Sequence, residues 1–123
     1  MQKVEKHYND ERWNGKTRDD THVVGLLNAF VHKTCYGNHF CMVFEILRCN
    51  LLEILKRHNY EGVPLDVCQE ISRQVLVGLD YLHRVCGVIH TDLKPENVMV
   101  CLTDEEMKEI VENGQLRTNE LFS

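Results

Sequence analysis

The feature that most constrains the fold is a regular apolar pattern between Leu65 and about Val85. Apolar side chains recur within it at spacings of three and four residues, at Ile71, Val75, Leu79 and Leu82. This spacing places them on one face of an α-helix and leaves charged residues on the others. Gly87 follows the pattern and is the residue type that most often ends a helix. The sequence therefore predicts a long amphipathic helix with one buried face.

Two shorter apolar runs upstream have the length of β-strands. The first covers residues 23–30 and the second covers residues 40–47. A polar segment with Gly37 and Asn38 separates them, so the two runs predict an antiparallel hairpin with a tight turn. A further stretch, residues 51–57, has the apolar spacing of a short amphipathic helix. Strands followed by helices indicate the α+β class.

A polar loop between two apolar runs follows the long helix. Residues 88–89 form the first run, for which we expect a short buried strand, and residues 98–100 form the second. The loop, residues 90–97, has the sequence H-T-D-L-K-P-E-N, and such loops between strands are common places for catalytic groups. Beyond it, an acidic stretch predicts a surface helix with Thr103 or Asp104 as the N-cap.

Three side chains of the loop have the chemistry that phosphoryl transfer requires. Such transfer depends on positioning and charge neutralisation more than on covalent help. The Asp92 carboxylate can accept a hydroxyl proton, the Lys94 ammonium can offset charge on the phosphate, and the Asn97 amide oxygen can bind Mg²⁺. The alternative is a polar turn without a chemical role, because one short match can arise by chance. The agreement of the helix, glycine and apolar runs around the loop favours the catalytic interpretation.

The segment Val88–Asn97 closely resembles the catalytic loop of the SR-protein kinases, which are eukaryotic serine/threonine kinases. Residues 42–47 (MVFEIL) and 78–83 (GLDYLH) resemble the same family, and the similarity covers residues 20–102. Most protein kinases have an arginine where this chain has Thr91, and that arginine clasps a phosphorylated activation loop. As in the resembled family, its absence implies activity that does not need this phosphate.

The resemblance also implies how the protein would bind its cofactors, ATP and Mg²⁺. Phe44 corresponds to the gatekeeper residue behind the adenine pocket. Glu45 and Leu47 correspond to hinge residues whose main-chain groups contact adenine, and Met99 corresponds to the residue beneath the adenine ring. The alternative for each is a plain core or strand residue, because such side chains are common in protein cores.

The resemblance divides the chain into four parts. Residues 1–22 correspond to an atypical, truncated start of the small lobe, and residues 23–47 to its β-hairpin. Residues 48–102 correspond to the hinge and the start of the large lobe with the catalytic loop, and residues 103–123 to the start of an acidic spacer insert. We therefore expect a partial protein-kinase fold.

Several parts of a working kinase are not in this sequence. It contains no G-x-G-x-x-G loop and no D-F-G metal-binding motif. Residues 1–8 resemble the segment directly after the catalytic lysine of strand three, so we expect Met1 to be an internal methionine. Residues 9–22 are too short for the helix that carries the glutamate partner of that lysine. We expect this chain alone to be inactive and only marginally stable, with the hairpin and the long helix partly exposed.

Two other function classes remain as alternatives. The first is a truncated pseudokinase that binds partners of the full kinase, which the incomplete region before residue 23 favours. The presence of a potential base, cation and metal ligand together favours a kinase fragment, because a binding module needs none of them. The second is a helical scaffold unrelated to kinases, which the loop motif disfavours.

Composition and charge narrow the partners and the location. The net charge of −5 argues against a general nucleic-acid binder, which usually has a basic face. We expect no membrane span and no signal peptide, since no apolar run is long enough and residues 1–10 are polar. The six cysteines form no CxxC pair, so we expect reduced thiols, several of them in the core. We expect a monomer in the cytoplasm and nucleus, and the resemblance implies Arg-Ser-rich splicing factors as substrates.

Overall fold

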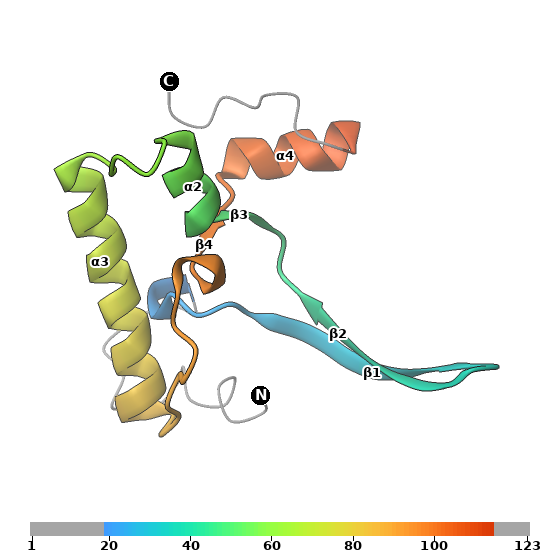
Figure 1. Cartoon of the computed structure of the whole chain (residues 1–123). Helices are drawn as coiled ribbons and strands as arrows, with labels where there is room; N and C mark the ends of the chain where they lie inside the picture. Colours follow the sequence, from blue (N-terminus) through green and yellow to red (C-terminus); the bar gives the residue numbers. More distant parts are fainter. Residues whose placement is uncertain (1–18, 115–123) are drawn as a thin grey trace.

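The computed structural model describes residues 19–114, and the elements below belong to that part of the chain. They follow one another as η1 (Asp19–Thr21), β1 (Leu26–Thr34), β2 (Gly37–Phe44), β3 (Leu47–Asn50), α2 (Leu51–Arg57), α3 (Leu65–Asp80), η2 (Tyr81–Val85), η3 (Pro95–Asn97), β4 (Met99–Cys101) and α4 (Asp104–Asn113) (Figure 1). Strands precede most of the helices, which confirms the α+β class. Most of the predicted small-lobe start, residues 1–22, and the end of the predicted spacer lie outside the described residues.

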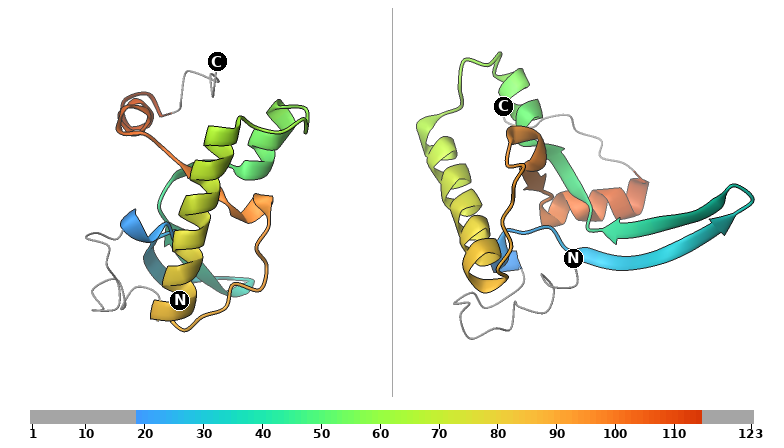
Figure 2. Two further views of the ribbon diagram at one scale, coloured as in Figure 1. Left: turned by 90° about the vertical axis from the view of Figure 1, so that its left-hand side faces the viewer. Right: turned by 60° about the horizontal axis from the view of Figure 1, so that its bottom comes forward.

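Strands β1 and β2 form the antiparallel hairpin that the sequence predicted. Their register runs from Leu26 opposite Phe44 to Thr34 opposite Gly37. Gly37 has a φ of 128°, a left-handed conformation that favours glycine in this tight turn. The hairpin extends away from the helices, as Figures 1 and 2 show, so most of its side chains are exposed. Its apolar residues therefore do not form the core of the described region.

The long helix predicted from Leu65 to Val85 is present as α3 followed by η2, where the last turn widens to π-helical geometry. The predicted apolar face is only half-buried. The core lies instead at the C-terminal end of the helix, where buried Tyr81, Val85 and Cys86 pack with Val23 and Val88. Helical spacing identified the helix, but it did not show which of its turns the rest of the chain covers.

The N-terminal side of this core depends on a close approach at Gly78. A Cβ atom at Gly78 would lie 3.1 Å from the main-chain oxygen of His22 and 3.5 Å from that of Thr21. Thr21, in η1, is buried as well. The glycine therefore lets the segment that leads into β1 lie directly against α3.

Two local predictions were wrong. Residues 88–89 form no strand, and the Ile89 side chain is 77% exposed. The strand that follows the loop, β4, pairs with β3, and none of the described strands pairs with residues 88–89. The cysteines are all free thiols as predicted, but only Cys86 is buried, so the expectation of several core cysteines was also wrong. The acidic helix α4 has the predicted N-cap, Thr103.

The exposed face of α3 carries a carboxylate whose pKa is shifted. Glu70 accepts hydrogen bonds from Arg73, with Nε at 2.9 Å, and from Gln74, and these bonds lower the pKa of Glu70 to about 2. A carboxylate with a lowered pKa stabilises the fold above its unfolded pKa and loses that contribution as the pH falls through the folded value.

No helix in the described residues is long and apolar enough to cross a membrane.

We expect the stabilisation from Glu70 to disappear between about pH 4.3, its unfolded pKa, and about pH 2. An NMR titration of the Glu70 carboxyl carbon measures the folded pKa directly. In the Arg73→Met variant, which removes the largest cause of the shift, that pKa should rise toward the unfolded value. A pKa for Glu70 that is the same in both proteins would contradict this assignment.

Candidate active site

The frame of the candidate site is the two-stranded antiparallel sheet of β3 and β4. Leu47 lies opposite Cys101, and Asn50 lies opposite Met99. The main-chain N–H of Leu51 also donates to the carbonyl of Val98, at 2.8 Å. The predicted hinge segment is therefore hydrogen-bonded to the strand that directly follows the predicted catalytic loop.

Helix α2 begins where this sheet ends and supports the loop. The side-chain oxygen of Asn50 accepts from the main-chain N–H of Glu53 at 3.0 Å and so caps the helix. Ile54 is buried, and α2 packs beside the short helix η3 that contains Asn97. Asn50 is thus part of strand β3 and also caps α2, the helix that packs beside the loop. The sequence interpretation missed this role, although asparagine is a favoured N-cap residue.

Replacing Asn50 by alanine should therefore lower the free energy of unfolding by about 1 kcal/mol, because one main-chain N–H of α2 loses its partner. Asn50→Asp is the matched control, since an aspartate oxygen can accept the same bond. Chemical denaturation followed by circular dichroism measures both variants. Equal stability of Asn50→Ala and wild type would show that the cap contributes nothing.

The loop brings together the three side chains predicted to perform chemistry. The Lys94 ammonium lies 3.1 Å from Oδ2 of Asp92. The Asn97 amide nitrogen donates to the same Oδ2 at 3.2 Å and to the Asp92 carbonyl at 2.9 Å. Both the Asp92 and the Lys94 side chains are exposed, so a substrate and a nucleotide can reach them.

Main-chain hydrogen bonds hold the loop in this shape. The Asp92 N–H donates to the His90 carbonyl at 2.5 Å and lies 3.3 Å from Nδ1 of the same histidine. The Asn97 N–H donates to the Lys94 carbonyl at 2.9 Å, which closes η3. Pro95 starts η3 with a backbone that suits the first helical position. Through these two contacts with the Asp92 N–H, His90 braces the start of the loop.

The oxygens available in the loop fit one side of a hydrated Mg²⁺ ion. Because the Asn97 amide directs its nitrogen at Asp92, its carbonyl oxygen is left for a cation. Within residues 19–114 no cluster of three or more His, Cys, Asp or Glu side chains can hold a metal. Mg²⁺ commonly takes one or two carboxylates and completes its shell with water and substrate phosphate. The Asn97 amide oxygen would supply the protein side of such a site.

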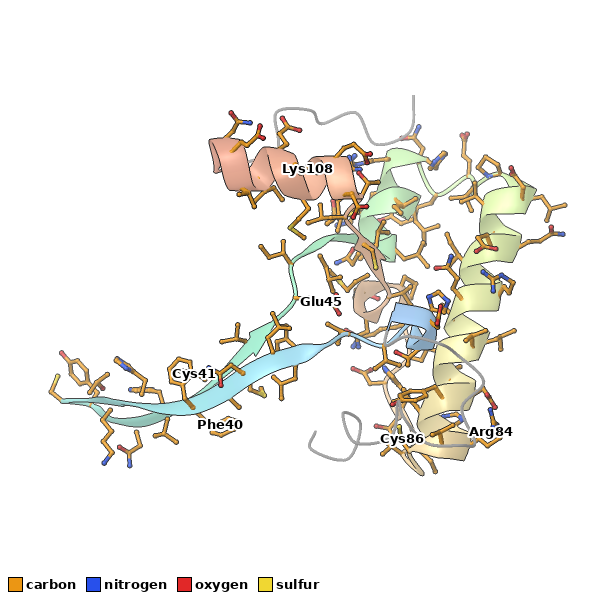
Figure 3. All side chains as sticks on the ribbon, turned by 180° about the vertical axis from the view of Figure 1, so that it is seen from behind. Phe40, Cys41, Glu45, Arg84, Cys86 and Lys108 are labelled. Atoms are coloured by element: carbon orange, nitrogen blue, oxygen red, sulfur yellow. The ribbon has the colours of Figure 1, made fainter. Side chains whose placement is uncertain are left out.

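The four residues assigned to adenine binding fall into two pairs. Leu47 and Met99 lie on the paired strands β3 and β4, beside the loop. Phe44 ends β2 and is half-buried, and Glu45 follows it where the chain leaves the hairpin (Figure 3). Glu45 is fixed there by Gly25, whose N–H donates to Oε1 at 2.6 Å and whose carbonyl accepts from the Glu45 N–H at 3.2 Å.

Comparison with known proteins gives the family. The model of the protein kinase domain matches residues 1–113. This chain belongs to the protein kinase family. Among its relatives are the protein kinase dsk1 of Schizosaccharomyces pombe, 44% identical over 89% of this chain, and the serine/threonine-protein kinase SRPK of Physarum polycephalum, 55% identical over 63%. The serine/threonine-protein kinase SKY1 of Saccharomyces cerevisiae is 48% identical over 73% of this chain.

These relatives confirm the predicted resemblance to the SR-protein kinases and the prediction of a partial kinase domain. The kinase chain spans 19% of dsk1, 18% of the Physarum SRPK and 13% of SKY1. All three are named as kinases, which gives no support to the binding-module alternative. The residues described above are thus part of a serine/threonine protein kinase domain.

Proposed function

We propose that this chain is the hinge and catalytic-loop segment of a kinase that transfers the γ-phosphate of ATP to serine residues in Arg-Ser-rich proteins. The observation that carries the proposal is that the side chains of Lys94 and Asn97 both lie within hydrogen-bonding distance of the Asp92 carboxylate. A carboxylate, a cation and an amide oxygen at one exposed place are the groups that phosphoryl transfer uses.

In this proposal Asp92 orients the serine hydroxyl and accepts its proton. The Lys94 ammonium, 3.1 Å from Oδ2 of Asp92, is close enough to face the transferred phosphate and offset its charge. The Asn97 amide nitrogen holds Asp92 in place while its oxygen binds the cation. Mg²⁺, when bound with ATP, neutralises charge on the phosphates.

For adenine, we assign the main-chain carbonyl of Glu45 and the main-chain groups of Leu47. The Glu45 N–H already donates to the Gly25 carbonyl, so the carbonyl oxygen of Glu45 is the group left for the base. Phe44 would close the back of the adenine pocket, and Met99 would lie beneath the ring. Because main-chain groups make these contacts, replacing the side chains of Glu45 or Leu47 should leave the contacts themselves available.

The proposed substrate class rests on relatives and on charge. SRSF protein kinase 3 of Mus musculus, named as a kinase of SRSF proteins, is 43% identical over 72% of this chain. The net charge of −5 favours encounter with a strongly basic substrate. We extend the proposal to a monomer that acts in the cytoplasm and nucleus, where such substrates would be met.

A chimera tests the substrate class. Residues 23–113 of this chain would replace the aligned segment of yeast SKY1, which supplies the remaining parts of the domain. We expect the chimera to phosphorylate an Arg-Ser repeat peptide in preference to a Lys-Ser repeat of the same length. Equal rates on the two peptides, or a preference for Lys-Ser, would contradict the proposed substrate.

A further inference from the structure

An ion pair joins the hinge strand to the acidic helix. Nη1 of Arg48, on β3, donates to Oε1 of Glu106, on α4. The two side chains are only 13% and 16% exposed. Because this pair is largely removed from water, its charges are weakly screened and each depends on the other.

The strand pairing directs Arg48 out of the ladder. Leu47 lies opposite Cys101 and Cys49 lies opposite Val100, so the register shifts at Arg48, which has no partner of its own. Such a bulge bends the strand and re-aims the side chain of the extra residue. The irregular pairing of β3 at Arg48 therefore directs its side chain toward α4.

The same carboxylate also fixes the start of α4. Oε2 of Glu106 accepts from the Thr103 N–H at 2.9 Å, and Oγ1 of Thr103 accepts from the Glu106 N–H at 3.3 Å, which is a complete capping box. Glu106 thus uses one oxygen for the helix and the other for Arg48. Figures 1 and 2 show α4 beside the β3 end of the molecule and apart from α3.

We propose that the Arg48–Glu106 pair is a clamp that docks α4 on the hinge strand and thereby positions the main-chain groups of Leu47 for adenine. Arg48 and Glu106 are positioning residues in this view, because neither contacts the nucleotide. The adenine part rests on the proposed function, whereas the docking of α4 does not. The Nε of Arg48 is buried without a hydrogen-bond partner, so the arginine depends on Glu106 for compensation.

The Arg48–Glu106 pair predicts a specific pattern of effects when one or both of its partners are replaced. Removing one partner leaves a buried charge uncompensated, whereas removing both does not. We therefore expect the effect of the double variant, Arg48→Met with Glu106→Gln, to be smaller than the sum of the two single effects and close to either one. Glu106→Gln keeps the capping box, since glutamine serves at that position, so it isolates the charge.

Hydrogen exchange and nucleotide affinity of the full chain test the clamp together. In Arg48→Met and in Glu106→Gln, the amides of α4 and β3 should exchange on the order of tenfold faster than in wild type. The affinity for a fluorescent ATP analogue should fall by a similar factor. Arg73→Met, which removes the exposed pair with Glu70, is the matched control and should change neither readout at these sites. Thr103→Ala should loosen the first turn of α4 while leaving β3 exchange and nucleotide affinity unchanged.

The possible outcomes separate the clamp from the proposed function. Unchanged exchange of α4 and β3 in both charge variants would overturn the clamp. Faster α4 exchange with unchanged nucleotide affinity would overturn the positioning role. If wild type does not bind the ATP analogue while both charge variants loosen α4 and β3, the proposed function fails and the clamp stands. If Arg48→Met does not fold, the isosteric Glu106→Gln variant decides by the same readouts.

Discussion

Replacing Asp92 by asparagine in the SKY1 chimera is expected to lower phosphate transfer by about two to four orders of magnitude. An amide cannot accept the proton of the serine hydroxyl, and it also loses the attraction of the Lys94 ammonium 3.1 Å away. ATP affinity should change little, because the adenine contacts assigned to Glu45 and Leu47 lie on the hinge. Initial rates of ³²P transfer to an Arg-Ser peptide, with ATP affinity measured separately, give both quantities.

Glu96→Gln is the matched control for this prediction. Glu96 lies in the same loop, is exposed and has no assigned role, so its neutralisation alters the charge of the loop without removing the base. We expect the Glu96→Gln rate to stay within about threefold of the unmodified chimera, as for an exposed charge with a small energetic effect. Loss of activity in both variants would assign the effect to loop charge, and retained activity in Asp92→Asn would exclude Asp92 as the base.

Tyr81→Ala is expected to have the largest effect on stability, about 3–5 kcal/mol. The Tyr81 side chain is 1% exposed. It packs with Val85 and Cys86 at the C-terminal end of the long helix, where the core of the described residues lies. Single domains commonly have only about 5–15 kcal/mol of stability, so most or all of it would be lost in a chain with so small a core. Urea denaturation followed by far-UV circular dichroism should show a strongly reduced or absent folded baseline.

Leu76→Ala is a suitable comparison because Leu76 lies on the same helix and is 65% exposed. Its effect should remain within about 1 kcal/mol, as for substitutions that open no cavity. A Tyr81→Ala variant that unfolds at the same urea concentration as Leu76→Ala would show that the cluster around Tyr81 is not the core.

The elements could be predicted where the sequence pattern is local. The hairpin followed from two apolar runs and Gly37, whose left-handed backbone the turn requires. The start of α4 could be predicted from Thr103. Glu106, three residues later, completes a capping box, and both residues of this motif can be read from the local sequence. In each case the residues that decide the structure are within a few positions of one another.

Features that depend on distant contacts could not be predicted. Spacing alone did not show that Tyr81 and Val85, at the end of the helix, would be buried while Ile71 and Val75 stay half-exposed. Burial at this end depends on Val23, which is far from Tyr81 in sequence. It also depends on the close approach of residues 21–22 to Gly78, which the helical pattern does not reveal. Residues 88–89 were misread as a strand because two apolar residues do not reveal whether a partner strand exists.

The site divides in the same way. The grouping of Asp92, Lys94 and Asn97 could be predicted because a short loop holds all three. The bonds that fix Glu45 to Gly25, 20 positions away, and Arg48 to Glu106, 58 positions away, have no local sequence signal. Only the folded chain shows that the hinge is held from both sides.

The most direct test of the central claim is the single-turnover rate of phosphate transfer from Mg²⁺-ATP to serine in an Arg-Ser peptide, measured for the chimera carrying residues 23–113. If this segment supplies a functional hinge and catalytic loop, transfer should occur on serine, require Mg²⁺ and disappear with Asp92→Asn. A chimera that is folded and binds ATP, yet transfers no phosphate while parental SKY1 does, would contradict the claim that this loop is a kinase catalytic loop.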